Sequence, residues 1–243
     1  MIDIEFLSKQ FIKDKPFDFD WILKTAYTDI QVRTITGHTP EVQAACVAYL
    51  KNAFEPLIDT EIADFDTKHA ELCEGFLDVI NKPEHKIDTQ NYGKAQKVIN
   101  IIFKFLVAYG KCKNVDDCHV PIDSFVLRWL YKSDKYQGAA WSNLSYEQYT
   151  RIQTDILDKI KSPIQVEAKE CTVSNRIEAD YFIWYITKVA KNYKDTYKSI
   201  NALTQSVHEF DTECVDKKTA ERIMEAAVEL YNKLKALSWE NET

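Results

Sequence analysis

Glycine and proline are scarce in this sequence. Its 243 residues include 5 Gly and 6 Pro, against usual frequencies of about 7% and about 5%. Sandwiches and barrels need a turn after nearly every strand, and these two residues supply many of those turns. The shortage therefore favours helices joined by short loops, and the predicted fold class is all-α.

The length suits one compact helical domain with a large buried core. We expect this domain to span residues 1–243, either as one body or as two closely packed lobes, a central lobe of about 40–175 and a second lobe of 1–39 with 176–243. Apolar residues at helical spacing predict the principal helices, at about 40–53, 57–80, 92–109, 125–131, 144–161, 178–194 and 216–237. The segments 132–144 and 164–176 are expected to be irregular.

Charge and cysteine usage limit the classes of partner. The net charge of −7 excludes a general electrostatic attraction to nucleic acid, so any such contact needs a local basic patch. The first residues include Asp3 and Glu5 and no long apolar stretch, which is not typical of a signal peptide. No apolar run approaches the roughly 18 residues that span a bilayer. We expect a soluble, cytoplasmic monomer with reduced thiols and no membrane partner.

Common metal and cofactor motifs are missing from the sequence. The six cysteines never form Cys-x-x-Cys, and the five histidines never form His-x-x-x-His. The glycine-rich loops that bind phosphates or dinucleotides do not occur either. We therefore predict neither a metal site nor a cofactor.

One segment departs from the acidic average. Residues 92–114 contain five lysines and no acidic residue, which makes this segment a candidate contact for phosphates. Lys97, Asn100 and Lys104 follow one another at helical spacing and predict a narrow polar stripe. A solvated stripe without function is the alternative, and for Lys104 it is preferred. The candidate DNA-binding residues are Gly93, Lys94, Gln96, Asn100, Lys104 and Lys111.

Two residues are candidates for catalysis. Lys97 is expected in the first turns of a mostly apolar helix, where burial and the helix N-terminus both favour the neutral amine that nucleophilic attack requires. Asp123 follows Pro121 and precedes an apolar helical run. A carboxylate there is held rigidly and stays ionised, which suits it to stabilise a developing positive charge. Helix capping alone would also explain Asp123.

These two segments resemble the helix-hairpin-helix DNA glycosylase superfamily, which includes the oxoguanine glycosylases. Gly93–Ile99 corresponds to the family hairpin Gly-Val-Gly-x-Lys-x-Ala, and Val120–Val126 corresponds to Val-Pro-Val-Asp-x-x-Val. The resemblance covers about residues 92–128. Two departures are that Ala95 replaces the second glycine of the hairpin, and that the lysine and the aspartate are farther apart than in the commonest members.

The resemblance implies a two-lobed helical fold and an enzyme that acts on a base flipped out of DNA. In this scheme Lys97 attacks the sugar C1′ and Asp123 steadies the positive charge on the sugar. The residues from Gly93 to Lys97 would bind backbone phosphates, and Tyr92 and Trp141 would line the base pocket. The predicted function is therefore that of a DNA glycosylase, with or without lyase activity, on a modified base.

Two alternatives remain open at this stage. Some distant relatives of the fold are thought to act as transferases on hypermodified bases of viral DNA, and in such an enzyme Lys97 and Asp123 would serve in binding or acid–base chemistry. A helical interaction or inhibitor protein without catalysis is the other alternative. In that protein Lys97 would be solvated and Asp123 would act only as a helix cap.

Overall fold

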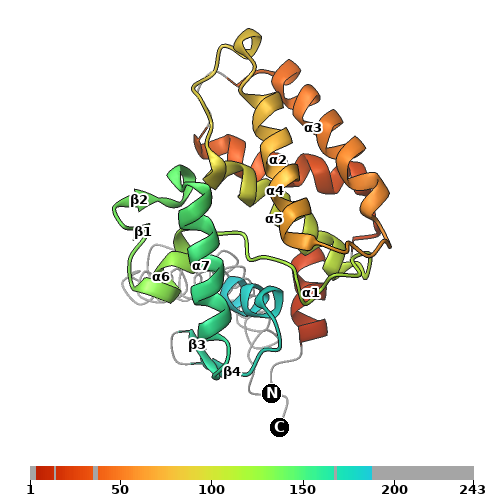
Figure 1. Cartoon of the computed structure of the whole chain (residues 1–243). Helices are drawn as coiled ribbons and strands as arrows, with labels where there is room; N and C mark the ends of the chain where they lie inside the picture. The colour runs from red at the N-terminus through yellow and green to blue at the C-terminus, as the bar shows by residue number, and fades with distance from the viewer. Residues whose placement is uncertain (1–3, 14, 35–37, 167–168, 188–243) are drawn as a thin grey trace, which may run out of the picture. The chain divides into compact units, whose positions relative to one another are not determined.

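A computed structural model describes residues 4–13, 15–34, 38–166 and 169–187 (Figure 1). The elements in chain order are α1 (Ile4–Ile12), α2 (Phe19–Thr34), α3 (Pro40–Phe54), η1 (Glu55–Leu57), α4 (Phe65–Ile80), η2 (Pro83–His85), α5 (Tyr92–Ala108), α6 (Ser124–Tyr131), β1 (Lys135–Tyr136), β2 (Ala139–Ala140), η3 (Trp141–Asn143), α7 (Tyr146–Lys159), β3 (Ile164–Val166) and β4 (Lys169–Cys171), followed by a helix over 176–187. The described part is mostly helical, which confirms the all-α class. The helix expected at 216–237 lies outside the described residues.

Two short antiparallel hairpins, β1–β2 and β3–β4, occur in segments for which we expected no regular structure. Lys135 pairs with Ala140 in the first hairpin, and Ile164 pairs with Cys171 in the second. The turn of the first hairpin has positive φ at Gln137 (49°) and Gly138 (83°). Two-residue hairpin turns often require this conformation. Gly138 is a typical residue for it, but glutamine seldom adopts it, so the sequence gave little indication of a hairpin here.

Side-chain caps define the starts of four of the described helices, α3, α4, α6 and α7. Thr39 accepts a hydrogen bond from the Val42 N–H at the start of α3, and Pro40 occupies the first position of that helix. Ser145 and Gln148 form a reciprocal capping box at the start of α7. These are the residue types that satisfy the unpaired N–H groups of a first turn, and the predicted start of α3 is confirmed.

Helix α5 lies at the centre of the packing. It contacts α1, α2, α4, α7 and η3. In Figure 1, α2 to α4 are coloured red to gold and the segment from α6 to β4 is coloured green to teal; α5 contacts helices of both groups. Every residue from Tyr92 to Leu106 is buried, with the single exception of Lys97. The expected polar stripe on α5 therefore does not face solvent, and only Lys97 reaches the surface from this part of the helix.

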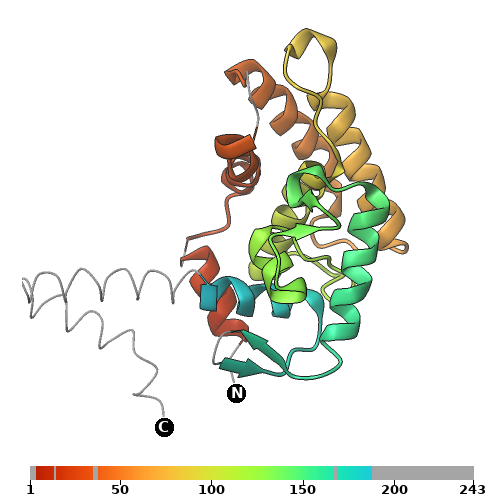
Figure 2. The same ribbon diagram turned by 90° about the vertical axis from the view of Figure 1, so that its left-hand side faces the viewer.

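The described residues up to Ile186 form one compact unit. The division into two lobes that the sequence suggests stays a prediction. Within this unit, α1 and α2 contact α5 directly. Figure 2 shows the red α1 beside the teal helix over 176–187, where the rings of Phe11 and Tyr181 lie 5.6 Å apart. None of the helices in the described part is both long and apolar enough to cross a membrane.

Candidate active site

The structure brings Lys97 and Asp123 together. Lys97 Nζ lies 3.8 Å from Asp123 Oδ2 and 2.8 Å from Asp29 Oδ2. The side chain of Lys97 is 12% exposed and that of Asp123 is 27% exposed, so the pair lies at a half-covered surface. Two residues that are 26 positions apart in the sequence thus share one site, which is called the lysine site below.

Asp29 is the member of the lysine site that sequence reasoning missed. It comes from α2, a helix that packs against α5, and its side chain is 48% exposed. No motif surrounds it. The sequence shows that α2 carries this carboxylate. It does not show which face of α5 the helix packs against, so it could not place Asp29 beside Lys97.

The two carboxyl oxygens of Asp123 have different partners. Oδ1 accepts hydrogen bonds from the backbone N–H groups of Phe125 and Val126, at 2.8 and 3.1 Å, and so caps α6. Oδ2 is the oxygen that faces Lys97. Capping therefore fixes the carboxylate in place and still leaves one oxygen for another task.

Trp141 completes the lysine site. Lys97 Nζ lies 4.6 Å from the centre of the Trp141 ring, a separation at which the ring face attracts a cation. The ring and the two carboxylates together are groups that attract a positively charged lysine. Trp141 was predicted to line the base pocket, and it does lie beside the predicted catalytic lysine.

Gly93 allows η3 to approach α5. Its N–H donates to Leu144 O at 3.0 Å, and a Cβ atom at this position would lie 2.1 Å from Trp141 O. Gly93 was expected to bind a phosphate. In the structure its N–H is already bonded within the protein, and the absence of a side chain serves a close backbone contact.

Two glutamines hold the segment that leads to Asp123. The side-chain amide of Gln96 donates to Ile122 O and accepts from the Ile122 N–H, both at 3.0 Å. Gln153 makes the same pair of bonds with Val120, at 2.7 Å to Val120 O and 3.2 Å from the Val120 N–H. Each amide thus substitutes for a neighbouring strand, and the backbone just before Asp123 is fixed to α5 and α7.

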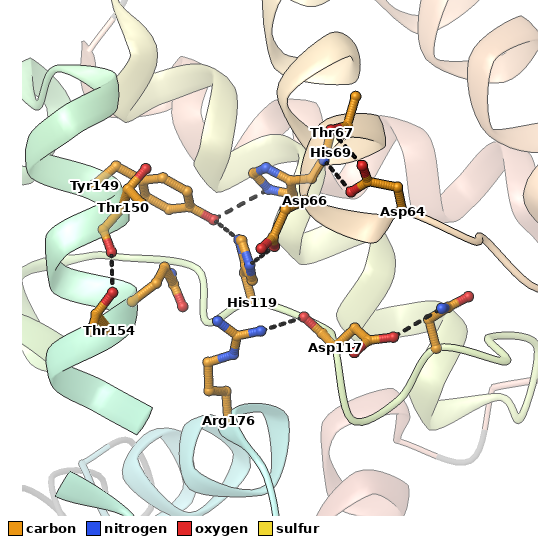
Figure 3. A network of polar contacts seen from close by, with 12 residues as sticks. Asp64, Asp66, Thr67, His69, Asp117, His119, Tyr149, Thr150, Thr154 and Arg176 are labelled. Carbon is orange, nitrogen blue, oxygen red and sulfur yellow. Dashed lines mark hydrogen bonds and ion pairs between the residues drawn. The ribbon is translucent and has the colours of Figure 1, made fainter. Parts of the chain in front are cut away.

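A buried polar network lies behind this segment (Figure 3). Tyr149 OH lies 2.7 Å from His119 Nδ1, and His119 Nε2 lies 2.8 Å from Asp66 Oδ1. On the other side, Asn100 Nδ2 donates to Tyr149 OH at 2.9 Å, and His69 Nε2 lies 2.8 Å from Asn100 Oδ1. The network runs from the exposed Asp66 to the fully buried interior.

The partners in this network determine its proton positions. Asn100 Oδ1 can only accept, so His69 Nε2 carries a proton. Tyr149 accepts from Asn100 and therefore donates its own proton to His119 Nδ1, which leaves His119 Nε2–H to donate to Asp66. Both histidines are neutral in this arrangement. Burial lowers the pKa of His69 well below its usual value and also lowers the pKa of His119, although Asp66 opposes the latter shift.

The remaining predicted DNA-binding residues make internal contacts. Gln96 and Asn100 are fully buried, and Lys94 donates to Gln90. Lys104 forms a buried ion pair with Asp180, whereas the half-exposed Lys111 pairs with Asp59 at 2.9 Å. A phosphate cannot reach the buried members without unpacking α5, because the predicted stripe belongs to the core and not to the surface. The preferred reading of Lys104 as a solvated residue is likewise wrong.

Tyr92 also belongs to the core. It is 8% exposed, and its ring packs against Tyr146 and Tyr149 with centroid distances of 5.2 and 5.3 Å. Of the two residues predicted for the base pocket, Trp141 is at the lysine site and Tyr92 packs in the interior.

The described residues contain no group of three or more His, Cys, Asp or Glu side chains arranged to bind a metal ion. Comparisons with protein-family models, with curated proteins and with solved structures found no match for this chain. The geometry of the lysine site therefore carries the functional argument.

Proposed function

We propose that this chain is an enzyme that cleaves the N-glycosidic bond of a base flipped out of DNA, with Lys97 and Asp123 as the reacting pair. The observation that carries the proposal is the 3.8 Å separation between Lys97 Nζ and Asp123 Oδ2. The resemblance to helix-hairpin-helix DNA glycosylases selected the same two residues without knowledge of their positions in space. Modified bases are the first substrate class to test.

The proposed reaction begins with the transfer of a proton from Lys97 to Asp29, whose Oδ2 lies 2.8 Å away. The resulting amine attacks C1′ of the sugar. The bond between C1′ and the base nitrogen breaks, its electron pair moves to the base, and the proton passes from Asp29 to the departing base. Oδ2 of Asp123 balances the positive charge that grows on the sugar.

The surroundings of Lys97 favour a second candidate, which is also an enzyme but a transferase. Two carboxylates and an aromatic face stabilise the protonated form of Lys97. A protonated lysine can bind a substrate but cannot act as a nucleophile. In a transferase that modifies a base, Lys97 would remain charged and orient the substrate, and Asp123 would act in acid–base chemistry. The proposal assigns no phosphate contact to five of the predicted DNA-binding residues, because all five are buried: Gly93, Lys94, Gln96, Asn100 and Lys104.

The test uses duplexes that carry normal and modified bases, with borohydride present to trap a Schiff base. We expect a covalent adduct with the unaltered protein and none with Lys97→Ala. Asp123→Asn should lower turnover by a factor of about 100 or more and still fold, because asparagine caps helices as well as aspartate does. Lys161→Ala, which removes an exposed lysine from a surface ion pair with Asp158, is the matched control and should react normally.

Mass spectrometry of the treated DNA distinguishes the candidates. Abasic sites support the glycosylase, and a heavier base supports the transferase. Full base release by Lys97→Ala would refute the role of the lysine as nucleophile. Unchanged DNA across the whole panel would contradict both enzymatic candidates and favour the non-catalytic interaction protein. That last hypothesis expected a solvated Lys97, whereas the lysine is mostly buried.

A further inference from the structure

Two thiols lie next to each other in the loop between α5 and α6. Cys112 Sγ and Cys118 Sγ are 3.6 Å apart. Cys118 is fully buried, and Cys112 is half-buried. A small movement would bring these sulfur atoms to the roughly 2.05 Å of a disulfide bond, and one of the two is accessible to a reagent from solution.

The loop that joins the two cysteines has a defined shape. The side-chain amide of Asn114 bonds to both backbone groups of Ile62, at 2.8 and 2.9 Å, and Asn114 O accepts from the Cys118 N–H at 3.1 Å. Arg176 donates to Asp117 O at 2.5 Å. These bonds hold the backbone between the two cysteines in one conformation, so the proximity of the two thiols is a property of the fold.

The two thiols are electrostatically unequal. Hydrogen bonding from Cys118 and from the Asn114 N–H lowers the pKa of the Cys112 thiol. The neighbouring Cys112, together with burial, raises the pKa of Cys118 well above its usual value. A reactive dithiol commonly has this asymmetry, with one accessible sulfur that attacks and one buried sulfur that resolves the intermediate.

We propose that Cys112 and Cys118 form a reversible redox pair that exchanges with small-molecule disulfides. The Cys112 thiolate attacks one sulfur of the oxidant, forms a mixed disulfide and releases one thiolate. Cys118 then attacks Cys112 Sγ, and its proton passes to the departing sulfur, which leaves as the second thiol. Two protein thiols are oxidised to one disulfide, and one small disulfide is reduced to two thiols. This proposal does not depend on the proposed enzymatic function.

The position of the pair connects it to the lysine site. Cys118 directly precedes His119, the first residue of the segment that ends at Asp123. Gln153 and Gln96 hold that segment through Val120 and Ile122. A disulfide at Cys118 would therefore constrain the residue that precedes this segment, at the end opposite to Asp123.

The experiment treats the full chain with oxidised glutathione, alkylates the remaining thiols and maps the tryptic peptides. Cleavage after Lys111, Lys113 and Arg128 separates the two cysteines, so an internal disulfide joins peptides 112–113 and 114–128. We expect this linked species, its loss after reduction, and its absence from Cys112→Ser. The matched control Cys171→Ala alters another buried cysteine and should still give the linked peptides.

A second variant keeps the proposal testable if the disulfide itself is short-lived. Cys118→Ser lacks the resolving thiol and should retain one glutathione on Cys112. In the untreated protein, Cys112 should react with iodoacetamide at least about tenfold faster than the buried Cys46. Free thiols at both Cys112 and Cys118 after oxidation of the folded chain, or a disulfide from Cys112 to a second molecule only, would overturn the proposal.

Discussion

The side chain of Gln96 bonds to both backbone polar groups of Ile122, at 3.0 Å each. Gln96 immediately precedes Lys97 on α5, and Ile122 immediately precedes Asp123. One buried amide therefore sets the distance between the two residues of the proposed reacting pair. It also donates to Gly93 O and accepts from Asn100 Nδ2, so that its hydrogen-bonding capacity is fully used.

Replacing Gln96 should harm both stability and the lysine site. In Gln96→Ala the Ile122 N–H and C=O remain buried without partners, and each such group costs about 1–3 kcal/mol. We expect a loss of about 3 kcal/mol in the free energy of unfolding, measured with urea. Gln10→Ala removes an exposed glutamine from α1 and should change stability by less than about 0.5 kcal/mol. Equal effects of the two substitutions would contradict the role given to Gln96.

A methyl group at Gly93 should separate η3 from α5. The added Cβ would lie 2.1 Å from Trp141 O, a backbone atom that cannot turn aside. We expect Gly93→Ala to cost about 2 kcal/mol or more, to weaken the contact between Trp141 and Lys97, and to alter the tryptophan fluorescence.

Gly75→Ala is the matched control for this prediction. Its Cβ would lie 2.2 Å from Tyr49 OH, which is the end of a side chain that can rotate away. Alanine also favours the helical conformation over glycine by about 1 kcal/mol, which offsets part of the lost Tyr49 contact. Gly75→Ala should therefore be less harmful than Gly93→Ala, and the reverse order would refute the backbone clash.

The local parts of this fold could be predicted because neighbouring residues determine them. Thr39 and Pro40 mark the start of α3, and Asp123 was expected to precede a helix, which it does as the cap of α6. The convergence of Lys97 and Asp123 was also predicted, through the resemblance of their two segments to one family. These features depend on short stretches of sequence that carry their own signal.

The orientation of α5 could not be predicted. A helix with Lys97, Asn100 and Lys104 along one side is typical of a surface helix with a polar stripe. Here the partners of the stripe come from distant elements, Tyr149 from α7 for Asn100 and Asp180 from helix 176–187 for Lys104. Polar residues can lie in a core when such partners exist, and their presence is a property of tertiary structure.

Loss of the buried ion pair should destabilise the protein strongly. Lys104 is 3% exposed and Asp180 is 7% exposed, and Lys104 Nζ also lies 4.5 Å from the Phe11 ring and 4.8 Å from the Tyr181 ring. Lys104→Met leaves a buried carboxylate without its cation, which costs about 3–5 kcal/mol. Urea denaturation of the variant should show a loss of that size.

The matched control for Lys104 is Lys111→Met, because Lys111 pairs with Asp59 at a site where both side chains are substantially exposed. Such pairs contribute less than about 1 kcal/mol. Combining Lys104→Met with Asp180→Leu removes both charges and should recover most of the loss. A single Lys104→Met variant as stable as Lys111→Met would show that the buried pair contributes little.

The two neutral histidines should make stability depend on pH. Burial lowers the pKa of His69 and of His119 in the folded state, whereas in the unfolded chain a histidine titrates near about 6.5. As the pH falls below that value, the unfolded chain binds protons that the folded state refuses. The free energy of unfolding should therefore be at its maximum above about pH 7. Between pH 7 and pH 5 it should fall by up to about 1.4 kcal/mol per pH unit for each histidine.

Two variants isolate this effect from that of other groups. In His69→Gln the amide Nε2 can still donate to Asn100, and in His119→Asn the amide oxygen can still accept from Tyr149, so each substitution keeps a hydrogen bond of the network and removes one titrating ring. Each should flatten the decline between pH 7 and pH 5 in urea unfolding of the full chain. The flattening should be larger for His69, since its pKa is lowered by burial with less opposition from the exposed Asp66. An unchanged slope in both variants would mean that the rings accept protons in the folded state, and the proton positions assigned to Tyr149 and Asp66 would then be wrong.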